Sequence, residues 1–344
     1  MKRILSAIVA LVIVLSCLSF AACNKPVEPS ETLAPTEAPT GKPTEAPTEK
    51  PTEKPTEAPT EAPKVTLDDM LSDLIDAYAG KRISVFGDSI STYGGISNST
   101  DYNTTIANNA VYYSGSNCGL TSEKNTYWGR FMERVGTRLC VDNAWSGDSL
   151  RSGRFLTRAK NLHNDTGSAD LNPDLILVYF GINDLWSGNG SVAQPNGELN
   201  EIMKNRGDKT EKEVFDEWFA DILAAYESGT ISAGNYDWDE LYALLIHIIT
   251  TTYTNAKVVC VGLTVNTNQN YKDCTELVPL HNESMTHITK HFGTLYVDQY
   301  SAINESNLNK YMGDGAGSYL HPNNAGHGVL FEEIVKVLYA DLKK

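Results

Sequence analysis

From residue 66 onward, short apolar runs alternate with segments in which apolar residues recur every three or four positions. The runs are rich in Val, Ile, Leu and Tyr and predict buried strands. They span residues 82–86, 138–144, 174–180, 257–263 and 294–298. The periodic segments predict helices at residues 127–135, 213–226, 240–252, 282–291 and 324–342. This alternation predicts an α/β fold with a parallel sheet covered on both faces, and a functional site at the carboxyl ends of the strands.

The folded part of the chain is predicted to begin at a helix with a capping box. Thr66 is its expected N-cap and Asp69 follows three residues later, ahead of apolar residues at helical spacing. Gly80 is expected to end this helix.

The first 23 residues read as an export signal. Two basic residues precede a short apolar core that is too short and too close to the N-terminus for a stable membrane span. The segment ends Leu-Ser-Phe-Ala-Ala-Cys and resembles a bacterial lipobox, which implies diacylglycerol on Cys23 as the mature N-terminus. The alternative is cleavage near Ala22 by an ordinary signal peptidase, which would release a secreted protein.

Residues 24–63 are predicted to be a disordered linker, and residues 64–344 a single large domain. Proline recurs every fourth position from Pro35 to Pro63, separated by Thr, Glu, Ala and Lys. Such a segment cannot form a core and is expected to be an extended, polyproline-like tether. At about 3.1 Å per residue it would reach on the order of 90 Å.

The charge balance excludes several classes of partner. The 344-residue chain has a net charge of -15 and 41% hydrophobic residues. Nucleic acid is therefore not an expected partner, polyanionic substrates are disfavoured, and neutral substrates remain open. Of the domain's cysteines, Cys140 and Cys260 fall in predicted buried strands. One disulfide using Cys118 or Cys274 remains an open alternative.

The candidate chemistry begins where the first strand ends. Gly87-Asp88-Ser89 follows that strand directly, so Ser89 is expected at a sharp turn that opens a helix. There its hydroxyl would be exposed, and the helix N-terminus would stabilise negative charge. Taken alone, the tripeptide is more typical of a simple helix cap than of a nucleophile.

Three further blocks follow in order. They are Asn143 to Asp148 after the second strand, Gly181 to Asp184 after the third, and His321 to Asn323 near the C-terminus. Together with Gly87 to Ser91, the four blocks resemble the SGNH/GDSL hydrolase superfamily, in a branch of bacterial secreted esterases. The resemblance covers most of residues 81–340. It implies a flavodoxin-like three-layer sandwich with a central, mostly parallel five-stranded sheet.

The resemblance also implies a role for each matching residue. Ser89 matches the nucleophile, His321 the general base, and Gly147 and Asn183 the oxyanion donors. This set agrees with what acyl transfer requires, namely a hydroxyl activated by an imidazole and fixed donors around a tetrahedral oxygen. No metal and no cofactor is expected.

The acid of the triad departs from the family pattern. The family places Asp three residues before the His, where this chain has Ser318. If residues 315–318 are an insertion that bulges outward, Asp314 takes that role. Otherwise the enzyme would work as a Ser-His dyad, with Ser318 or a backbone carbonyl orienting the ring.

Other residues carry weaker signals. His287 and His291 have a spacing that can bind zinc, but the Glu of the zinc-protease motif is absent, so ordinary packing or solvation is preferred. Tyr93, Trp145 and Trp186 follow the blocks closely and are expected to line the cleft and stack on sugar rings, with core packing as the alternative. Residues 186–215 read as an insertion that would cap the site.

These features together predict an exported, lipid-anchored esterase on the outer face of a bacterial membrane. Its expected substrates are O-acetyl or other short acyl esters on polysaccharide. A lipase or thioesterase of the same mechanism is one alternative. A glycan-binding lipoprotein that has lost its triad acid is another.

Overall fold

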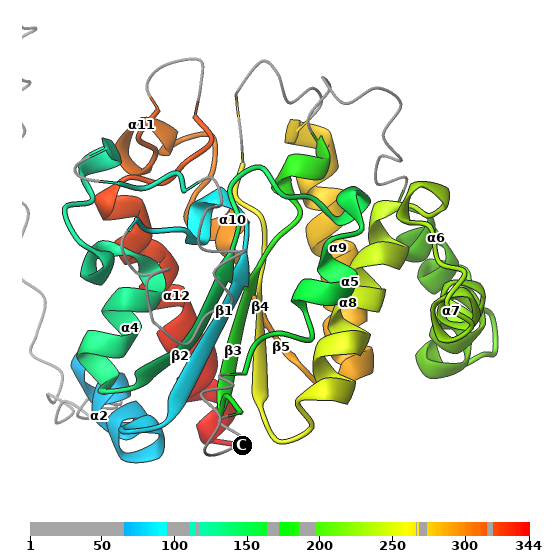
Figure 1. Ribbon diagram of the computed structural model, residues 1–344, viewed down its shortest axis with the longest axis horizontal. Coiled ribbons are helices and arrows are strands. Elements are labelled where there is room, and N and C mark those ends of the chain that lie inside the picture. Colours follow the sequence, from blue (N-terminus) through cyan, green and yellow to red (C-terminus); the bar gives the residue numbers. More distant parts are fainter. Residues whose placement is uncertain are drawn as a thin grey trace, which may run out of the picture. The chain divides into compact units, whose positions relative to one another are not determined.

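The computed structural model describes residues 65–94, 111–114, 117–163, 172–185, 197–265, 267, 274–314 and 319–344 (Figure 1). The chain divides into two units, Met1–Glu61 and Ala62–Lys344, and every described residue belongs to the second. The signal segment, Cys23 and residues 24–63 lie outside the described residues. Among the described residues, no helix is both long and apolar enough to cross a lipid bilayer.

Five strands form the central sheet. They are β1 (Arg82–Gly87), β2 (Arg138–Ala144), β3 (Leu175–Tyr179), β4 (Lys257–Val261) and β5 (Leu295–Val297). Their order in the sheet is β2-β1-β3-β4-β5, and every neighbouring pair is parallel. This is the strand order of the flavodoxin-like folds. The predicted fold class is therefore confirmed.

Helices cover both faces of this sheet (Figure 1). The described helices are α2 (Leu67–Tyr78), α4 (Tyr127–Val135), α5 (Phe155–Arg158), α6 (Glu198–Lys204), α7 (Glu211–Glu227), α8 (Trp238–Thr252), α9 (Cys274–Phe292), α10 (Gln299–Ala302), α11 (Leu308–Tyr311) and α12 (Asn324–Leu342). On one face of the sheet α12 packs against α2 and α4, and on the other α8 packs against α5 and α9, with α6 and α7 further out.

Local sequence signals set many of these boundaries. Thr66 and Asp69 form the predicted capping box of α2, and α4, α12 and β2 have their predicted bounds. α9 is longer than predicted and begins at Cys274 rather than at Asn282. Pro279 lies inside it, and because proline lacks an amide hydrogen, its position argues against a helix when only the sequence is read.

Two packing features place the loops at the carboxyl edge of the sheet. β3 is buried along its whole length, as expected for a strand covered on both faces. Just beyond it, Gly181 has φ +119°, and a Cβ there would lie 2.7 Å from atoms of the Trp238 ring. Only glycine therefore fits at this turn, which leads directly into Asn183.

Cys118, Cys140 and Cys260 are the cysteines whose side chains the structure describes. Cys118 and Cys260 are free thiols, and the Cys140 sulfur lies 3.8 Å from the carbonyl oxygen of Leu162. The expectation that Cys140 and Cys260 are buried in strands is confirmed. A disulfide through Cys118 is not formed.

Candidate active site

The predicted site residues meet at the carboxyl edge of the sheet. Ser89 follows β1, Gly147 follows β2 and Asn183 follows β3, and these three strands are neighbours in the sheet. The loop before α12 brings in Asp314 and His321. Parallel strands deliver their carboxyl ends to the same edge, so segments more than 200 residues apart contact each other there.

Ser89 lies on a tight turn directly after β1. Asp88 caps this turn through a 3.0 Å hydrogen bond from the Ile90 amide to its Oδ1. The expected helix is only a single 3-10 turn, Ser89–Ser91, so the prediction of a helix N-terminus beside Ser89 is wrong. A helix dipole needs several aligned peptide units, and local amide donors remain as the source of positive potential.

His321 connects the serine hydroxyl to a carboxylate. Its Nε2 lies 2.8 Å from the Ser89 Oγ, and its Nδ1 lies 3.0 Å from the Asp314 Oδ2. We call Ser89, His321 and Asp314 the triad. Burial works to raise the pKa of Asp314, but the hydrogen bonds and charge of His321 outweigh it, with a further hydrogen bond from Tyr112. Together they hold that pKa below its ordinary value.

A short antiparallel pairing explains how Asp314 reaches the imidazole from seven residues away. Met312 and Pro322 form an antiparallel bridge, and the Gly313 amide donates to the His321 carbonyl at 2.8 Å. The Asp314 Oδ2 also accepts the amides of Leu320 and His321 at 3.0 and 2.7 Å. The carboxylate is therefore fixed from the backbone side as well, although residues 315–318, Ser318 among them, lie outside the described residues.

The candidate oxyanion donors lie on the turns that follow β2 and β3. Gly147 has φ +75° with no atom near a hypothetical Cβ, so its turn requires glycine and its backbone is uncovered. Asn183 lies on the turn after β3, where its Nδ2 donates to the Asp148 carbonyl at 2.9 Å. That bond holds the carboxamide beside the Gly147 turn.

A buried arginine, which the sequence analysis missed, ties these turns together. The Arg158 guanidinium forms an ion pair with Asp148 and donates to the Gly87 carbonyl at 2.9 Å. It also bonds both the side chain and the backbone carbonyl of Asn143. One cation therefore joins the end of β1, the end of β2 and the loop that carries Gly147.

Two further buried carboxyl groups, those of Asp88 and Asp184, lie on the turns that follow β1 and β3. Burial raises the pKa of Asp88 to about 7 and likewise raises that of Asp184 to about 7. Both Asp184 oxygens accept backbone amides, from Leu150 and Arg151, each at 3.0 Å. Asp184 therefore organises the loop after Gly147 from the β3 side.

The three aromatic residues predicted to bind substrate differ in position. Tyr93 is only 7% exposed and belongs to the hydrophobic core. Trp145 is half-buried, and the Arg154 guanidinium lies over its ring, 4.9 Å from the centroid. Trp186 lies outside the described residues. Of the two described rings, Trp145 is therefore better placed to contact a ligand.

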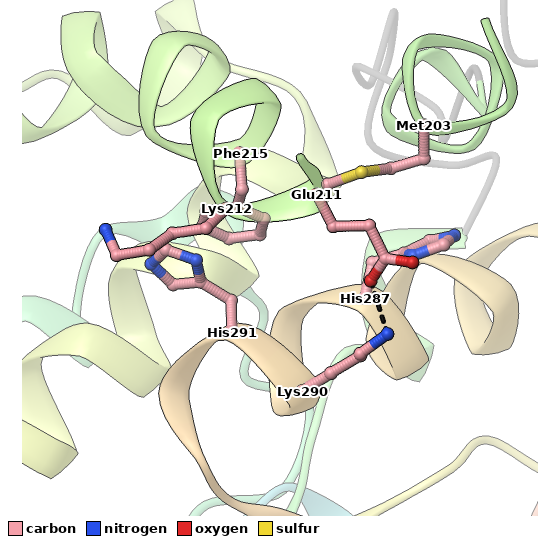
Figure 2. A pocket seen from close by; sticks show the side chains of 7 residues that line it. All are labelled: Met203, Glu211, Lys212, Phe215, His287, Lys290 and His291. Atoms are coloured by element: carbon pink, nitrogen blue, oxygen red, sulfur yellow. Dashed lines mark hydrogen bonds and ion pairs between the residues drawn. The ribbon is translucent and has the colours of Figure 1, made fainter. Parts of the chain in front are cut away.

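A cavity of about 240 Å³ lies elsewhere, between α6, α7 and α9 (Figure 2). It contains both histidines of the weak zinc signal, but Figure 2 shows His287 near Glu211, while His291 lies against Phe215, with ring centroids 3.9 Å apart. In the described part of the chain, no three His, Cys, Asp or Glu side chains are grouped to hold a metal ion. No triad residue lines this cavity. Its residues are Met203, Glu211, Lys212, Phe215, His287, Lys290 and His291.

The insertion after Asn183 is in part helical. Residues 186–196 lie outside the described residues, and the residues that follow form α6, which packs against α7 and α9. The predicted cap over the site remains a prediction for residues 186–196.

A parallel three-layer α/β fold with Ser, His and Asp hydrogen-bonded at its carboxyl edge is typical of serine hydrolases. A family model described as GDSL-like lipase/acylhydrolase matches residues 85–329. The chain therefore belongs to the GDSL-like lipase/acylhydrolase family and is a carboxylic ester hydrolase. A second model, described as a PT disordered repeat, matches residues 30–65.

Solved structures with the same domain type are distant in sequence. A protein of Bacteroides ovatus described as a GDSL-like lipase is 21% identical, with 76% of this chain and 99% of that chain covered and a TM-score of 0.48. A similarly described protein of Bacteroides uniformis is 22% identical, covering 75% and 94%, with a TM-score of 0.45. A catalytic mutant of Axe2, an acetylxylan esterase from Geobacillus stearothermophilus, is 16% identical, covering 76% and 95%, with a TM-score of 0.44. No curated protein matches the sequence.

Replacing Arg158 is expected to destabilise the protein far more than replacing Arg154, although both pair with Asp148. The Arg158 side chain is 4% exposed and that of Arg154 is 47% exposed. We expect Arg158→Met to lower the free energy of unfolding by about 3–5 kcal/mol, because it leaves a buried carboxylate without its main partner. Arg154→Met should cost less than about 1 kcal/mol. Urea unfolding of both variants measures this difference, and equal losses would contradict the organising role of Arg158.

Proposed function

We propose that the protein is a serine esterase that removes O-acetyl or other short acyl groups from polysaccharide. The observation that carries the mechanism is the hydrogen-bonded series from Ser89 Oγ through His321 to Asp314, at 2.8 and 3.0 Å. It lies beside the turns that carry Gly147 and Asn183.

The reaction begins when the Ser89 Oγ attacks the ester carbonyl carbon and its proton passes to the Nε2 of His321. The carboxylate of Asp314 stabilises the resulting imidazolium. The carbonyl oxygen becomes an oxyanion, for which the Ser89 and Gly147 amides and the Asn183 carboxamide are the donors.

Collapse of this tetrahedral intermediate breaks the bond to the leaving alcohol, which takes the proton from His321. The acyl group is then bound to Ser89. A water molecule, deprotonated by His321, attacks this acyl-enzyme, and the acid leaves as the serine hydroxyl is restored.

Two features support a neutral, sugar-bearing substrate. Trp145 directly precedes the Ser146-Gly147 turn and is half-buried, so the exposed part of its ring is available to contact a sugar. The net charge of -15 disfavours anionic substrates.

The first 63 residues support a location at the bacterial cell surface. In this proposal Cys23 carries the lipid and residues 24–63 hold the domain away from the membrane. Acylated polysaccharide in the cell envelope or near it is then within reach of the site.

We expect Ser89→Ala to abolish hydrolysis of p-nitrophenyl acetate and leave folding intact, because only a hydroxyl is removed. The wild-type enzyme should prefer acetyl over butyryl and octanoyl esters, and should release acetate from acetylated xylan or mannan. Retention of more than a few per cent of turnover in Ser89→Ala would contradict the assignment of the nucleophile. Preference for long chains would instead identify a lipase.

Asp314→Asn is expected to lower kcat by something approaching 10⁴, as in triads where the amide favours the wrong imidazole tautomer. Ser318→Ala should change kcat little if Asp314 orients His321. Steady-state kinetics of both variants test this assignment. A loss below about tenfold for Asp314→Asn together with a larger one for Ser318→Ala would favour the neutral orienting group.

Cys23→Ala is expected to move the protein from the membrane fraction into the medium without changing its specific activity. The tether separates the anchor from the domain, so catalysis should not depend on the lipid. Fractionation and esterase assays of cells producing each form measure this. Wild-type protein found free in the medium would indicate ordinary signal-peptidase cleavage.

A further inference from the structure

Tyr112 contacts the segments of all three triad residues, although it lies in none of the four sequence blocks. Its ring stacks on the imidazole of His321, with the centroids 3.4 Å apart and the planes 11° apart. Its hydroxyl donates to the Asp314 Oδ1. This oxygen is the one that does not face His321, because Nδ1 bonds Oδ2.

The backbone of Tyr112 is tied to the nucleophile turn as well. Its amide donates to the Thr92 Oγ1 at 2.9 Å, and the Thr92 hydroxyl donates to the Ser89 carbonyl at 2.8 Å. On the other side, Asn117 Nδ2 donates to the Tyr112 carbonyl at 2.6 Å. The ring is therefore held in place between the turn of Ser89 and the loop of Asp314.

We propose that Tyr112 is a positioning residue that holds the imidazole of His321 against Ser89 and determines how strongly the Asp314 carboxylate stabilises the imidazolium. The inference rests on the proposed triad. The hydroxyl aims the carboxylate and withdraws part of its negative charge. The ring face restricts the imidazole to one plane and lies over the positive charge that develops during the reaction.

Of the titratable groups around the triad, Asp88 and Asp184 have pKa values of about 7 and change protonation in the neutral range, whereas the groups nearest Tyr112 do not. Burial raises the pKa values of Cys118 and Tyr113, and burial together with Asp314 raises that of Tyr112 far above its ordinary value. On α12, burial lowers the pKa of His327 to about 3. Because substitutions of Tyr112 leave Asp88 and Asp184 in place, the effect of Tyr112 is measured as the shift of the acid limb of the kcat/KM profile relative to the wild type.

Removal of the Tyr112 hydroxyl and removal of its ring are expected to shift the acid limb of the pH profile in opposite directions, although both should lower kcat. Tyr112→Phe leaves the carboxylate with more charge for the imidazolium, so the acid limb should move to higher pH by about half a unit. kcat for p-nitrophenyl acetate should fall by about tenfold because the carboxylate is less well aimed, with KM unchanged. Tyr112→Leu also removes the ring, so its kcat should be lower still and its acid limb should lie below that of Tyr112→Phe.

A third variant keeps the packing intact. Replacing Tyr112 with 3,5-difluorotyrosine makes the hydroxyl a stronger donor with little change in shape, so the acid limb should move to lower pH. The matched control is Tyr253→Phe, which removes a hydroxyl whose hydrogen bonds join Leu162, Lys160 and His163. It should reduce stability in a thermal melt and leave the pH profile of the wild type.

The outcomes separate this inference from the function on which it rests. If Ser89→Ala keeps its activity, the triad assignment itself fails. If Ser89→Ala is inactive but the acid limbs of Tyr112→Phe and of the difluorotyrosine variant coincide with the wild type, only the positioning role fails. A change in KM alone would make Tyr112 a substrate contact and overturn the inference.

Discussion

The ion pair between Arg158 and Asp148 is the interaction on which the geometry of the site depends. A guanidinium and a carboxylate removed from water lose several kcal/mol of solvation each, and only close pairing and further hydrogen bonds offset this cost. Arg158 meets that condition through the carbonyl of Gly87 and through Asn143. The same contacts that satisfy the charge fix the ends of β1 and β2, so the positions of Ser89 and Gly147 relative to each other follow from the pairing of one cation.

The buried carboxyl groups of the site make the stability of the protein depend on pH. Burial raises the pKa values of Asp88 and Asp184 from 3.8 to about 7. Each group binds its proton more tightly in the folded state, so its contribution to stability is complete below pH 3.8 and is lost as the pH rises through about 7. The pKa of Asp314 is shifted the other way, and its contribution is lost as the pH falls. The site therefore combines carboxyl groups that favour opposite ends of the pH range.

The fold could be predicted because its signals are local. β2, α4 and α12 are bounded by apolar periodicity and by caps, and their residues are adjacent in sequence. Ser89 and His321 lie in two of the four short sequence blocks. These blocks predict a site only because the family resemblance links them to one another. Arg158 and Tyr112 could not be found in this way. Each acts through contacts with residues far away in the sequence, and neither an arginine in a short helix nor a tyrosine in a loop has a pattern of its own. The expected helix after Ser89 was wrong because Asp88 is an equally good cap for one 3-10 turn.

The acid of the triad shows why spacing in sequence is a poor guide to spacing in the site. His321 needs a carboxylate near its Nδ1, and the path that the chain takes from one to the other is irrelevant to the imidazole. Once Met312 pairs with Pro322 and the Gly313 amide bonds the His321 carbonyl, residue 314 is opposite the imidazole whatever the length of the loop between them. The cost of a longer loop rises only slowly with its length. With the extra residues, the Asp314 carboxylate still reaches the imidazole but has to be oriented toward it. The amides of Leu320 and His321 and the hydroxyl of Tyr112 provide this orientation, because they bind both oxygens of Asp314.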